Sequence, residues 1–191
     1  MSDTPQPDDT PQVILVTGNM AAGKSTDAQA LAERLPRSVH LRGDVFRRMI
    51  VSGRAGMDFD LSTEAERQLD LRYRLAAQAA TTYVEAGFTV VYQDVVIGSG
   101  LAHVAGLHAA EHPLSVFVLC PRPDVVAARD AARGKTGYAD EAAVYAFDRV
   151  LREETPRLGY WLDTSEMRVD ETVDDLLGHQ PQARVLPERL P

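Results

Sequence analysis

The feature that most constrains this chain is a glycine-rich loop between an apolar run and a helical pattern. Residues 18–25 read GNMAAGKS, which matches the spacing G-x-x-x-x-G-K-[ST] in full. The apolar run at 13–16 precedes the loop, and a helical pattern that ends before Pro36 follows it. Such a loop turns successive backbone N–H groups towards one phosphate, and the start of the helix adds its positive end. We therefore expect a nucleoside triphosphate site and not a chance match in a turn rich in glycine and alanine.

Different residues of this loop have different chemical tasks. Glycine at positions 18 and 23 lets the backbone curl, the Lys24 ammonium can reach the β- and γ-phosphates, and the Ser25 hydroxyl can bind Mg²⁺. We predict Lys24 as a catalytic residue and Ser25 as a metal ligand. The nucleotide-binding residues predicted here are Gly18, Asn19, Met20, Ala21, Ala22, Gly23, Lys24, Ser25 and Thr26.

The rest of the chain alternates short apolar runs with longer helical patterns. Strands are expected near 13–16, 38–41, 88–92, 116–120 and 160–162, and a long helix near 63–86, with Thr63 and Glu66 in a capping-box pattern at its start. This alternation predicts an α/β fold with one parallel sheet covered on both faces. Ligands of such folds bind at the carboxyl ends of the strands.

Composition limits the partners of this domain. The 191 residues carry a net charge of −8, and no apolar run approaches the length of a membrane span. We expect a cytoplasmic protein, monomeric or homodimeric, that binds neither nucleic acid nor membrane. Residues 1–11 are expected to be a disordered leader, 12–178 the domain, and 179–191 a tail that packs loosely or adds a short extension. The histidines at 103, 108 and 112 are expected on a solvated helix face and not at a metal site.

Two aspartates follow predicted strands and are candidates for the chemistry. Asp44, after the second strand, could accept the proton of an acceptor hydroxyl, and it could also cap the next helix. Asp94, after the third strand, could bind Mg²⁺ or contact the acceptor, and the competing interpretation is a loop-capping residue. Gln93 stands where many NTP-driven machines have an acid, which favours a transferase.

Two pairs of arginines add positive charge. Arg47 and Arg48, in the first turn after Asp44, are predicted to bind the acceptor. Arg129 and Arg133 share one helix face, and Arg133 enters a glycine-containing segment suited to a lid that excludes water. We predict Arg133 as a catalytic residue, although both pairs would also suit ordinary exposed surfaces.

The motifs together resemble the small P-loop kinases of the nucleoside-monophosphate-kinase fold, most of all the chloramphenicol phosphotransferase-like family and more loosely the tunicamycin-resistance proteins. The resemblance rests on the loop at 18–26, on Gly43 and Asp44, and on the segments at 90–95, 129–134 and 162–165. It implies three layers with a five-stranded sheet in the order 2-3-1-4-5, Asp44 as catalytic base, Arg133 as lid arginine, and Arg129 and Thr164 at the nucleotide base. The chain departs from that family at Asn19, Met20 and Gln93 and in the segment 51–60.

The function expected is transfer of a γ-phosphate from ATP or GTP, with Mg²⁺, to a hydroxyl of a small molecule, with antibiotics among the candidates. A nucleotide or primary-metabolite kinase is the first alternative. A P-loop NTPase or nucleotide-dependent binding protein without an acceptor is the second, because the loop alone does not define the reaction.

Overall fold

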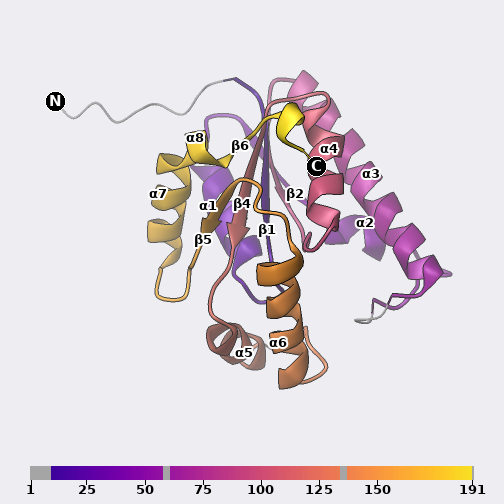
Figure 1. The fold of residues 1–191 in the computed structure, drawn as a ribbon. Helices are drawn as coiled ribbons and strands as arrows, with labels where there is room; N and C mark the ends of the chain where they lie inside the picture. Colours follow the sequence, from indigo (N-terminus) through magenta and orange to yellow (C-terminus); the bar gives the residue numbers. More distant parts are fainter. Residues whose placement is uncertain (1–9, 58–60, 134–136, 191) are drawn as a thin grey trace.

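A parallel sheet runs through the centre of the protein, with its main strands in the order β2-β3-β1-β4-β5 (Figure 1). The computed structural model describes residues 10–57, 61–133 and 137–190. The strands are β1 (Val13–Gly18), β2 (Ser38–Arg42), β3 (Thr89–Gln93), β4 (Leu114–Leu119) and β5 (Tyr160–Leu162). The predicted order is confirmed, and all four pairings within it are parallel.

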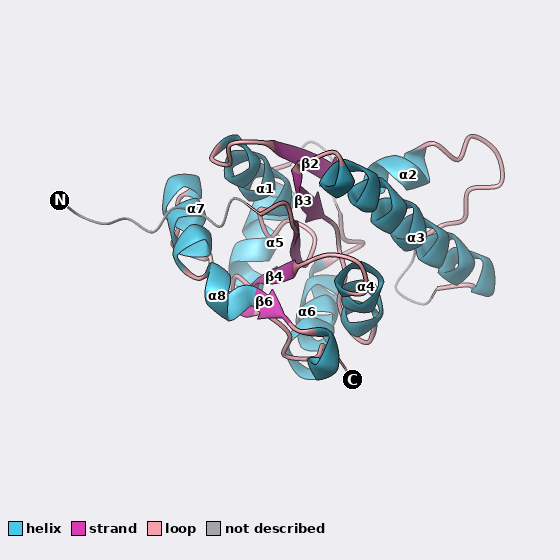
Figure 2. Cartoon of the chain, turned by 90° about the horizontal axis from the view of Figure 1, so that it is seen from above, coloured by secondary structure: helices cyan, strands magenta, loops and turns pink. Residues whose placement is uncertain are grey.

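Helices cover both faces of this sheet and make three layers (Figure 2). One face packs against α3 (Thr63–Glu85) and α4 (Gly100–Ala109), and the other against α1 (Lys24–Glu33) and α7 (Val169–Gly178). Successive residues of β1 alternate between the two layers: Val13 and Leu15 join the α3 side, whereas Ile14 and Val16 join the α1 side. An apolar run buried on both faces is the pattern expected of a central parallel strand.

The N-cap of the long helix α3 lies one residue before Thr63, the position that the sequence pattern predicts. Ser62 is the N-cap, and its hydroxyl accepts a hydrogen bond from the backbone N–H of Ala65 at 3.2 Å. The serine hydroxyl is as good an acceptor as that of Thr63, so the first turn starts from it. The helix ends as expected before Gly87, whose φ of 85° is the left-handed conformation typical after a helix.

Shorter elements follow β2 and β4. These are α2 (Asp44–Arg48), α5 (Pro123–Ala131), α6 (Glu141–Arg149) and the π-helical turn Val150–Glu154 that continues α6. The tail contains α8 (Gln180–Ala183), β6 (Arg184–Val185) and a 3₁₀ turn at Pro187–Arg189. Strand β6 pairs antiparallel with the beginning of β4, so the tail adds an extension to the sheet. The leader at 1–11 lies outside the described residues except for 10 and 11.

The histidines of α4 do not all lie on a solvated face. His103 is exposed, as predicted, and its Nε2 lies 3.1 Å from Oδ1 of Asp70. His108, however, is 3 % exposed, and its ring lies 5.2 Å from that of Tyr92. The prediction was wrong for His108 because α4 packs against both the sheet and α3, which leaves little of its surface to water. Burial lowers the pKa of His108 to about 4.

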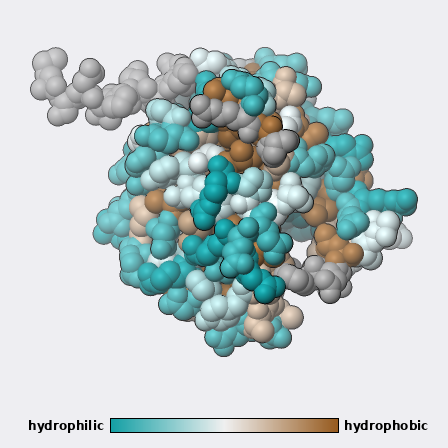
Figure 3. Space-filling model, viewed as in Figure 1, coloured by the Kyte–Doolittle hydropathy of each residue, from teal (hydrophilic) through white to brown (hydrophobic). Residues whose placement is uncertain are grey.

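No helix among the described residues is long and apolar enough to cross a bilayer. The face seen in Figure 3 is largely hydrophilic, with hydrophobic residues in separate areas.

Candidate active site

The glycine-rich loop joins β1 to α1 at the carboxyl edge of the sheet. Two glycines shape it, since Gly18 has a φ of 141° and Gly23, the N-cap of α1, has a φ of 100°. A side chain at Gly18 would collide with the Leu119 carbonyl, and one at Gly23 would lie 2.8 Å from Oδ2 of Asp27. Glycine is therefore required twice over, for its conformation and for space.

Lys24 lies folded into the loop. Its Nζ donates a hydrogen bond to the Asn19 carbonyl at 2.5 Å, and the residue is only 6 % exposed. Burial, together with the nearby charges of Arg133 and Arg72, lowers the pKa of Lys24 to about 7. An anion bound in the loop would favour the charged ammonium, so phosphate binding and protonation of Lys24 support each other.

Ser25 faces a residue that sequence reasoning did not assign to the site. Its hydroxyl donates to Oε1 of Gln93 at 3.1 Å. Mg²⁺ at such loops takes most of its ligands from phosphate and water, so a hydroxyl beside a neutral amide oxygen fits this ion. Among the described residues there is no cluster of three or more acidic, histidine or cysteine side chains that could hold a metal by itself.

Asp94 is the centre of a buried polar network. Its carboxylate pairs with Arg72, accepts from the Tyr92 hydroxyl at 3.0 Å, and accepts from the backbone N–H of Val95 at 2.7 Å. A side chain at Gly43 would overlap this carboxylate. These contacts engage the lone pairs of Asp94, and through them Asp94 orients the Arg72 guanidinium. Its role as a Mg²⁺ ligand stays a prediction.

Arg72 is the main residue missed by sequence reasoning. It lies on α3 beside Tyr73, at the border of the apolar face, and 11 % of its side chain is exposed. The only signal in the sequence is an arginine next to the apolar face of a helix. Many amphipathic helices have such an arginine without a functional role. Its guanidinium lines the cleft because Asp94 compensates its charge there.

Asp44 lies in the first turn of α2, with Gly43 as the cap. Arg48 pairs with its Oδ2 at 3.2 Å, whereas Oδ1 is buried without a hydrogen bond among the described residues. Oδ1 also lies 3.7 Å from Nε of Arg42, an ion pair that leaves its hydrogen-bonding capacity unused among the described residues. Arg47 turns away and donates to the Ala55 carbonyl at 2.6 Å, which fixes the segment before 57.

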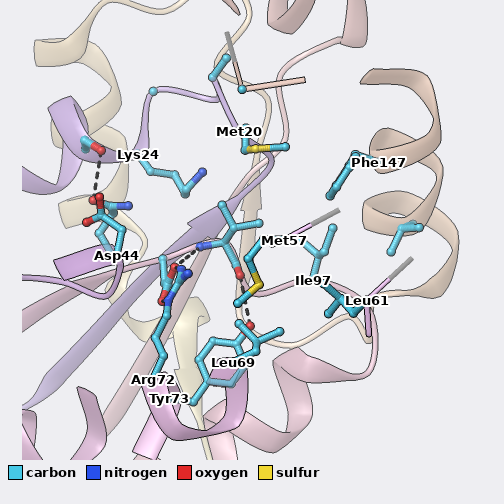
Figure 4. A pocket seen from close by; sticks show the side chains of 18 of the residues that line it. Met20, Lys24, Asp44, Met57, Leu61, Leu69, Arg72, Tyr73, Ile97 and Phe147 are labelled. Carbon is cyan, nitrogen blue, oxygen red and sulfur yellow. Dashed lines mark hydrogen bonds and ion pairs between the residues drawn. The ribbon is translucent and has the colours of Figure 1, made fainter. Parts of the chain in front are cut away.

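These side chains border a cleft of about 610 Å³ (Figure 4). Lys24, Asp44 and Arg72 gather on one side of it, while the opposite side is apolar. The apolar lining residues are Met20, Ala21, Met57, Leu61, Leu69, Tyr73, Val95, Ile97, Phe147 and Val150.

A second pocket of about 300 Å³ lies on the other side of the loop. It shares Ala21, Gly23 and Arg133 with the cleft and is also lined by Arg129 and Thr164. The Arg129 guanidinium donates to the Thr164 carbonyl at 2.9 Å, which joins the end of α5 to the loop after β5. Of the predicted site residues, those that line neither hollow are Gly18, Asn19, Ala22, Arg47 and Arg48.

The segment predicted as a lid begins at Arg133. Arg133 lines both hollows, while residues 134–136 lie outside the described residues. After them, the backbone N–H of Gly137 donates to Asp130, and the Tyr138 hydroxyl donates to the Met20 carbonyl at 2.9 Å. These contacts tie the segment to the phosphate loop. Asp58 and Asp60 of the expected acceptor segment also lie outside the described residues.

Comparison with known proteins agrees with this architecture. A search of curated proteins finds no significant match. Among solved structures, a Janibacter sp. HTCC2649 sugar kinase has a TM-score of 0.67 at 14 % identity, covering 93 % of this chain and 97 % of that one. The Deinococcus radiodurans tunicamycin resistance protein also has a TM-score of 0.67, at 18 % identity, with 93 % and 99 % covered. The Mycobacterium tuberculosis APS kinase CysC, in complex with AMPPNP and APS, has a TM-score of 0.64 at 16 % identity, with 88 % and 96 % covered.

The sequence profile of the family AAA_33, described as an AAA domain, matches residues 13–154. That range begins at β1 and includes the phosphate loop, Asp44, the Arg72–Asp94 pair and Arg133. The chain therefore belongs to the AAA_33 family of AAA domains, and its fold is that of the small P-loop kinases.

Proposed function

We propose that this protein is a phosphotransferase that moves the γ-phosphate of a nucleoside triphosphate to a hydroxyl group of a small molecule. The observation that carries the proposal is the cleft, in which Lys24 of the phosphate loop and the carboxylate of Asp44 border one space of about 610 Å³. A loop that only bound or hydrolysed a nucleotide would not need so large a hollow beyond its phosphate end.

The donor side of this cleft supports transfer of a phosphoryl group. Lys24 would neutralise charge on the β- and γ-phosphates, and Arg133, which borders both hollows, would add positive charge there. Mg²⁺, held by Ser25 with Gln93 beside it, would supply the bridging positive charge of the donor.

The acceptor side supports a partly apolar molecule. Met57, Leu69 and Ile97 belong to a wall that a highly hydroxylated sugar would not match, because each buried hydroxyl needs a hydrogen-bond partner. The polar contacts gather near Asp44 and Arg72, where one hydroxyl could be held. We infer an amphipathic acceptor with one reactive hydroxyl, a class that includes antibiotics and other natural products.

In the reaction, the acceptor oxygen would form a bond to the γ-phosphorus while the bond to the β–γ bridging oxygen breaks. The acceptor proton would pass to Oδ1 of Asp44, which accepts no hydrogen bond from the described residues. Arg48, 3.2 Å from Oδ2, would hold the carboxylate in place. The nucleoside diphosphate leaves with its new terminal oxygen against Lys24.

Kinases of primary metabolites are the second candidate. Solved structures with this fold include proteins described as a sugar kinase, an APS kinase and a tunicamycin resistance protein, so the fold accommodates several acceptor types. The Arg72 guanidinium favours this alternative in one respect, because it could also contact an anionic acceptor.

The test is a mass-spectrometric screen for a mass gain of one phosphate across hydroxylated metabolites and antibiotics, with ATP and with GTP. A hit should require Asp44, so Asp44→Asn should lower turnover by roughly 10²-fold or more, while Asp174→Asn, at a distant residue with 66 % of its side chain exposed, should not. Turnover that survives Asp44→Asn would refute the assigned base. Nucleotide hydrolysis that no compound redirects would favour the NTPase alternative.

A further inference from the structure

A row of polar side chains on one face of α1 leads away from the phosphate loop. Ser25, Gln29 and Glu33 are spaced by four residues, so they follow one another along the helix. Two polar residues of the sheet lie opposite this row. Gln93 of β3 pairs with the residue two positions after His40 of β2, so both side chains lie on the same face of the sheet. The proposed function explains Ser25 and the amide oxygen beside it, and it leaves the rest of this group without a role.

Three hydrogen bonds connect the members of this group. Nε2 of Gln29 donates to Oε1 of Glu33 at 2.9 Å, and Nδ1 of His40 lies 2.8 Å from Oε1 of Gln29. At the other end, the Ser25 hydroxyl donates to Oε1 of Gln93 at 3.1 Å. Between the two ends, Nε2 of His40 is buried and has no aligned hydrogen bond within the described part of the chain. The Gln93 side chain is close enough to this imidazole to influence its pKa.

The chemistry of the first two links defines the direction of the whole series. A carboxylate only accepts, so Gln29 turns its NH₂ group to Glu33 and its oxygen to His40. That oxygen requires the imidazole N–H at Nδ1, which leaves a lone pair at Nε2 of the neutral ring. Burial lowers the pKa of His40 from its usual 6.5, so the ring is neutral at pH 7.5.

Resting on the proposed function, we propose that His40 is a positioning residue for the Mg²⁺ of the phosphate donor. The lone pair at Nε2 of His40 would accept from the NH₂ group of Gln93, which keeps the amide oxygen of Gln93 turned to Ser25. The Ser25 hydroxyl then gives its proton to that oxygen and directs its own lone pairs to the metal. With the amide reversed, the NH₂ group would face the hydroxyl and compete with the metal for the same lone pairs.

The glutamine at position 93 is what makes such a partner necessary. A carboxylate there would accept from the Ser25 hydroxyl in either orientation, whereas an amide accepts at one end and donates at the other. Turning the Gln93 amide by half a rotation therefore changes what Ser25 meets. His40 lies on the same sheet face with an unused acceptor atom, so it can define which end of the amide faces the helix.

The test is isothermal titration calorimetry of the full chain at pH 7.5 with the β,γ-imido analogues of ATP and GTP, without any acceptor. Each analogue is titrated with Mg²⁺ and with EDTA, and the ratio of the dissociation constants, EDTA over Mg²⁺, measures the contribution of the metal. His40→Leu should lower this ratio by about 5-fold or more, because it removes a group that orients a metal ligand. Its dissociation constant in EDTA should stay that of the wild type, whereas a merely structural role would weaken binding in both conditions alike.

Two further variants and a control examine the links separately. His40→Gln retains one donor and one acceptor, so its ratio should stay within about 2-fold of the wild type. Gln29→Leu, at an exposed position of α1, removes the acceptor that holds the N–H at Nδ1 and should lower the ratio several-fold. Gln78→Leu makes the same change at an exposed position of α3 and should leave the ratio unchanged.

A wild-type ratio in His40→Leu would overturn the inference, and so would an equal loss of affinity in EDTA and in Mg²⁺. If His40→Leu does not fold, Gln29→Leu decides in its place, and an unchanged ratio there would overturn the inference as well. Failure of both analogues to bind the wild type, or binding that Mg²⁺ does not strengthen, would instead overturn the proposed function, and the inference with it.

Discussion

Replacing Asp27 by asparagine should stabilise the nucleotide-free protein at neutral pH and leave its stability almost unchanged in acid. The carboxyl group is 5 % exposed, and burial raises its pKa from 3.8 to about 6, with Arg129 opposing. Between these two values the native state binds more protons than the unfolded state. The stability of the wild type therefore falls as the pH rises through this window, and the full penalty is present above pH 6.

The size of the effect follows from the shift in pKa. A change of one pKa unit corresponds to about 1.4 kcal/mol, so a rise from 3.8 to about 6 corresponds to about 3 kcal/mol. Asparagine has the same shape and does not titrate. About 0.5 kcal/mol of this penalty is already present at pH 4, so the difference in unfolding free energy, variant minus wild type, should increase by about 2.5 kcal/mol between pH 4 and pH 8.

Urea unfolding followed by circular dichroism, at half-unit steps from pH 4 to pH 8, measures this difference. With ordinary urea dependence, the midpoint of the variant should move about 1 M or more above that of the wild type at pH 8. Asp174→Asn is the control, because 66 % of that side chain is exposed and its contribution should be small at every pH. Parallel stability curves for Asp27→Asn and the wild type would show that the carboxyl group is not desolvated.

Three further predictions concern other groups of the site and core. Lys24→Ala should lower turnover by roughly 10²-fold or more in a steady-state assay with an identified acceptor, since it removes a charge aimed at the phosphates; an unchanged rate would contradict its role. Asp94→Asn should destabilise the protein by about 3–5 kcal/mol in urea unfolding, because it leaves Arg72 buried without its counter-charge, and a loss below about 1 kcal/mol would refute this. His108→Leu should make the stability of the fold less sensitive to acid. Burial lowers the pKa of His108 from 6.5 to about 4, so the native state holds this imidazole neutral. Its contribution to the unfolding free energy of the wild type is therefore complete above pH 6.5 and is lost as the pH falls towards 4. Identical acid unfolding profiles of that variant and the wild type would contradict the expected burial.

The architecture could be predicted because each element has a local signal. The spacing of glycines and Lys24 defines the phosphate loop, the apolar runs define the strands, and the three- and four-residue periodicity defines α3. The strand order came from family resemblance and not from these patterns. It was confirmed because the loop and the alternation of strands and helices identify the fold class together.

The missed residues share a different property, which is that their role depends on contacts far along the chain. Arg72 becomes part of the cleft only because Asp94, 22 residues later, neutralises it. Asp27 reads as an ordinary polar residue of a helix, but in the fold it is 5 % exposed, with its carboxylate beside Gly23 at the second pocket. His108 was placed in water because no acidic pattern of a metal site accompanies it, whereas the small residues of α4 let that helix pack closely.

The short strand β6 has a consequence for how the molecule behaves in concentrated solution. The outer edge of β4 is divided, with β5 pairing at Phe117 to Leu119 and β6 pairing at Leu114 and Ser115. Without β6, the apolar beginning of β4 would present unpaired backbone groups to a neighbouring molecule, and exposed edges of this kind are templates for intermolecular strand pairing. Two residues, Arg184 and Val185, thus cover the part of the β4 edge that β5 does not reach.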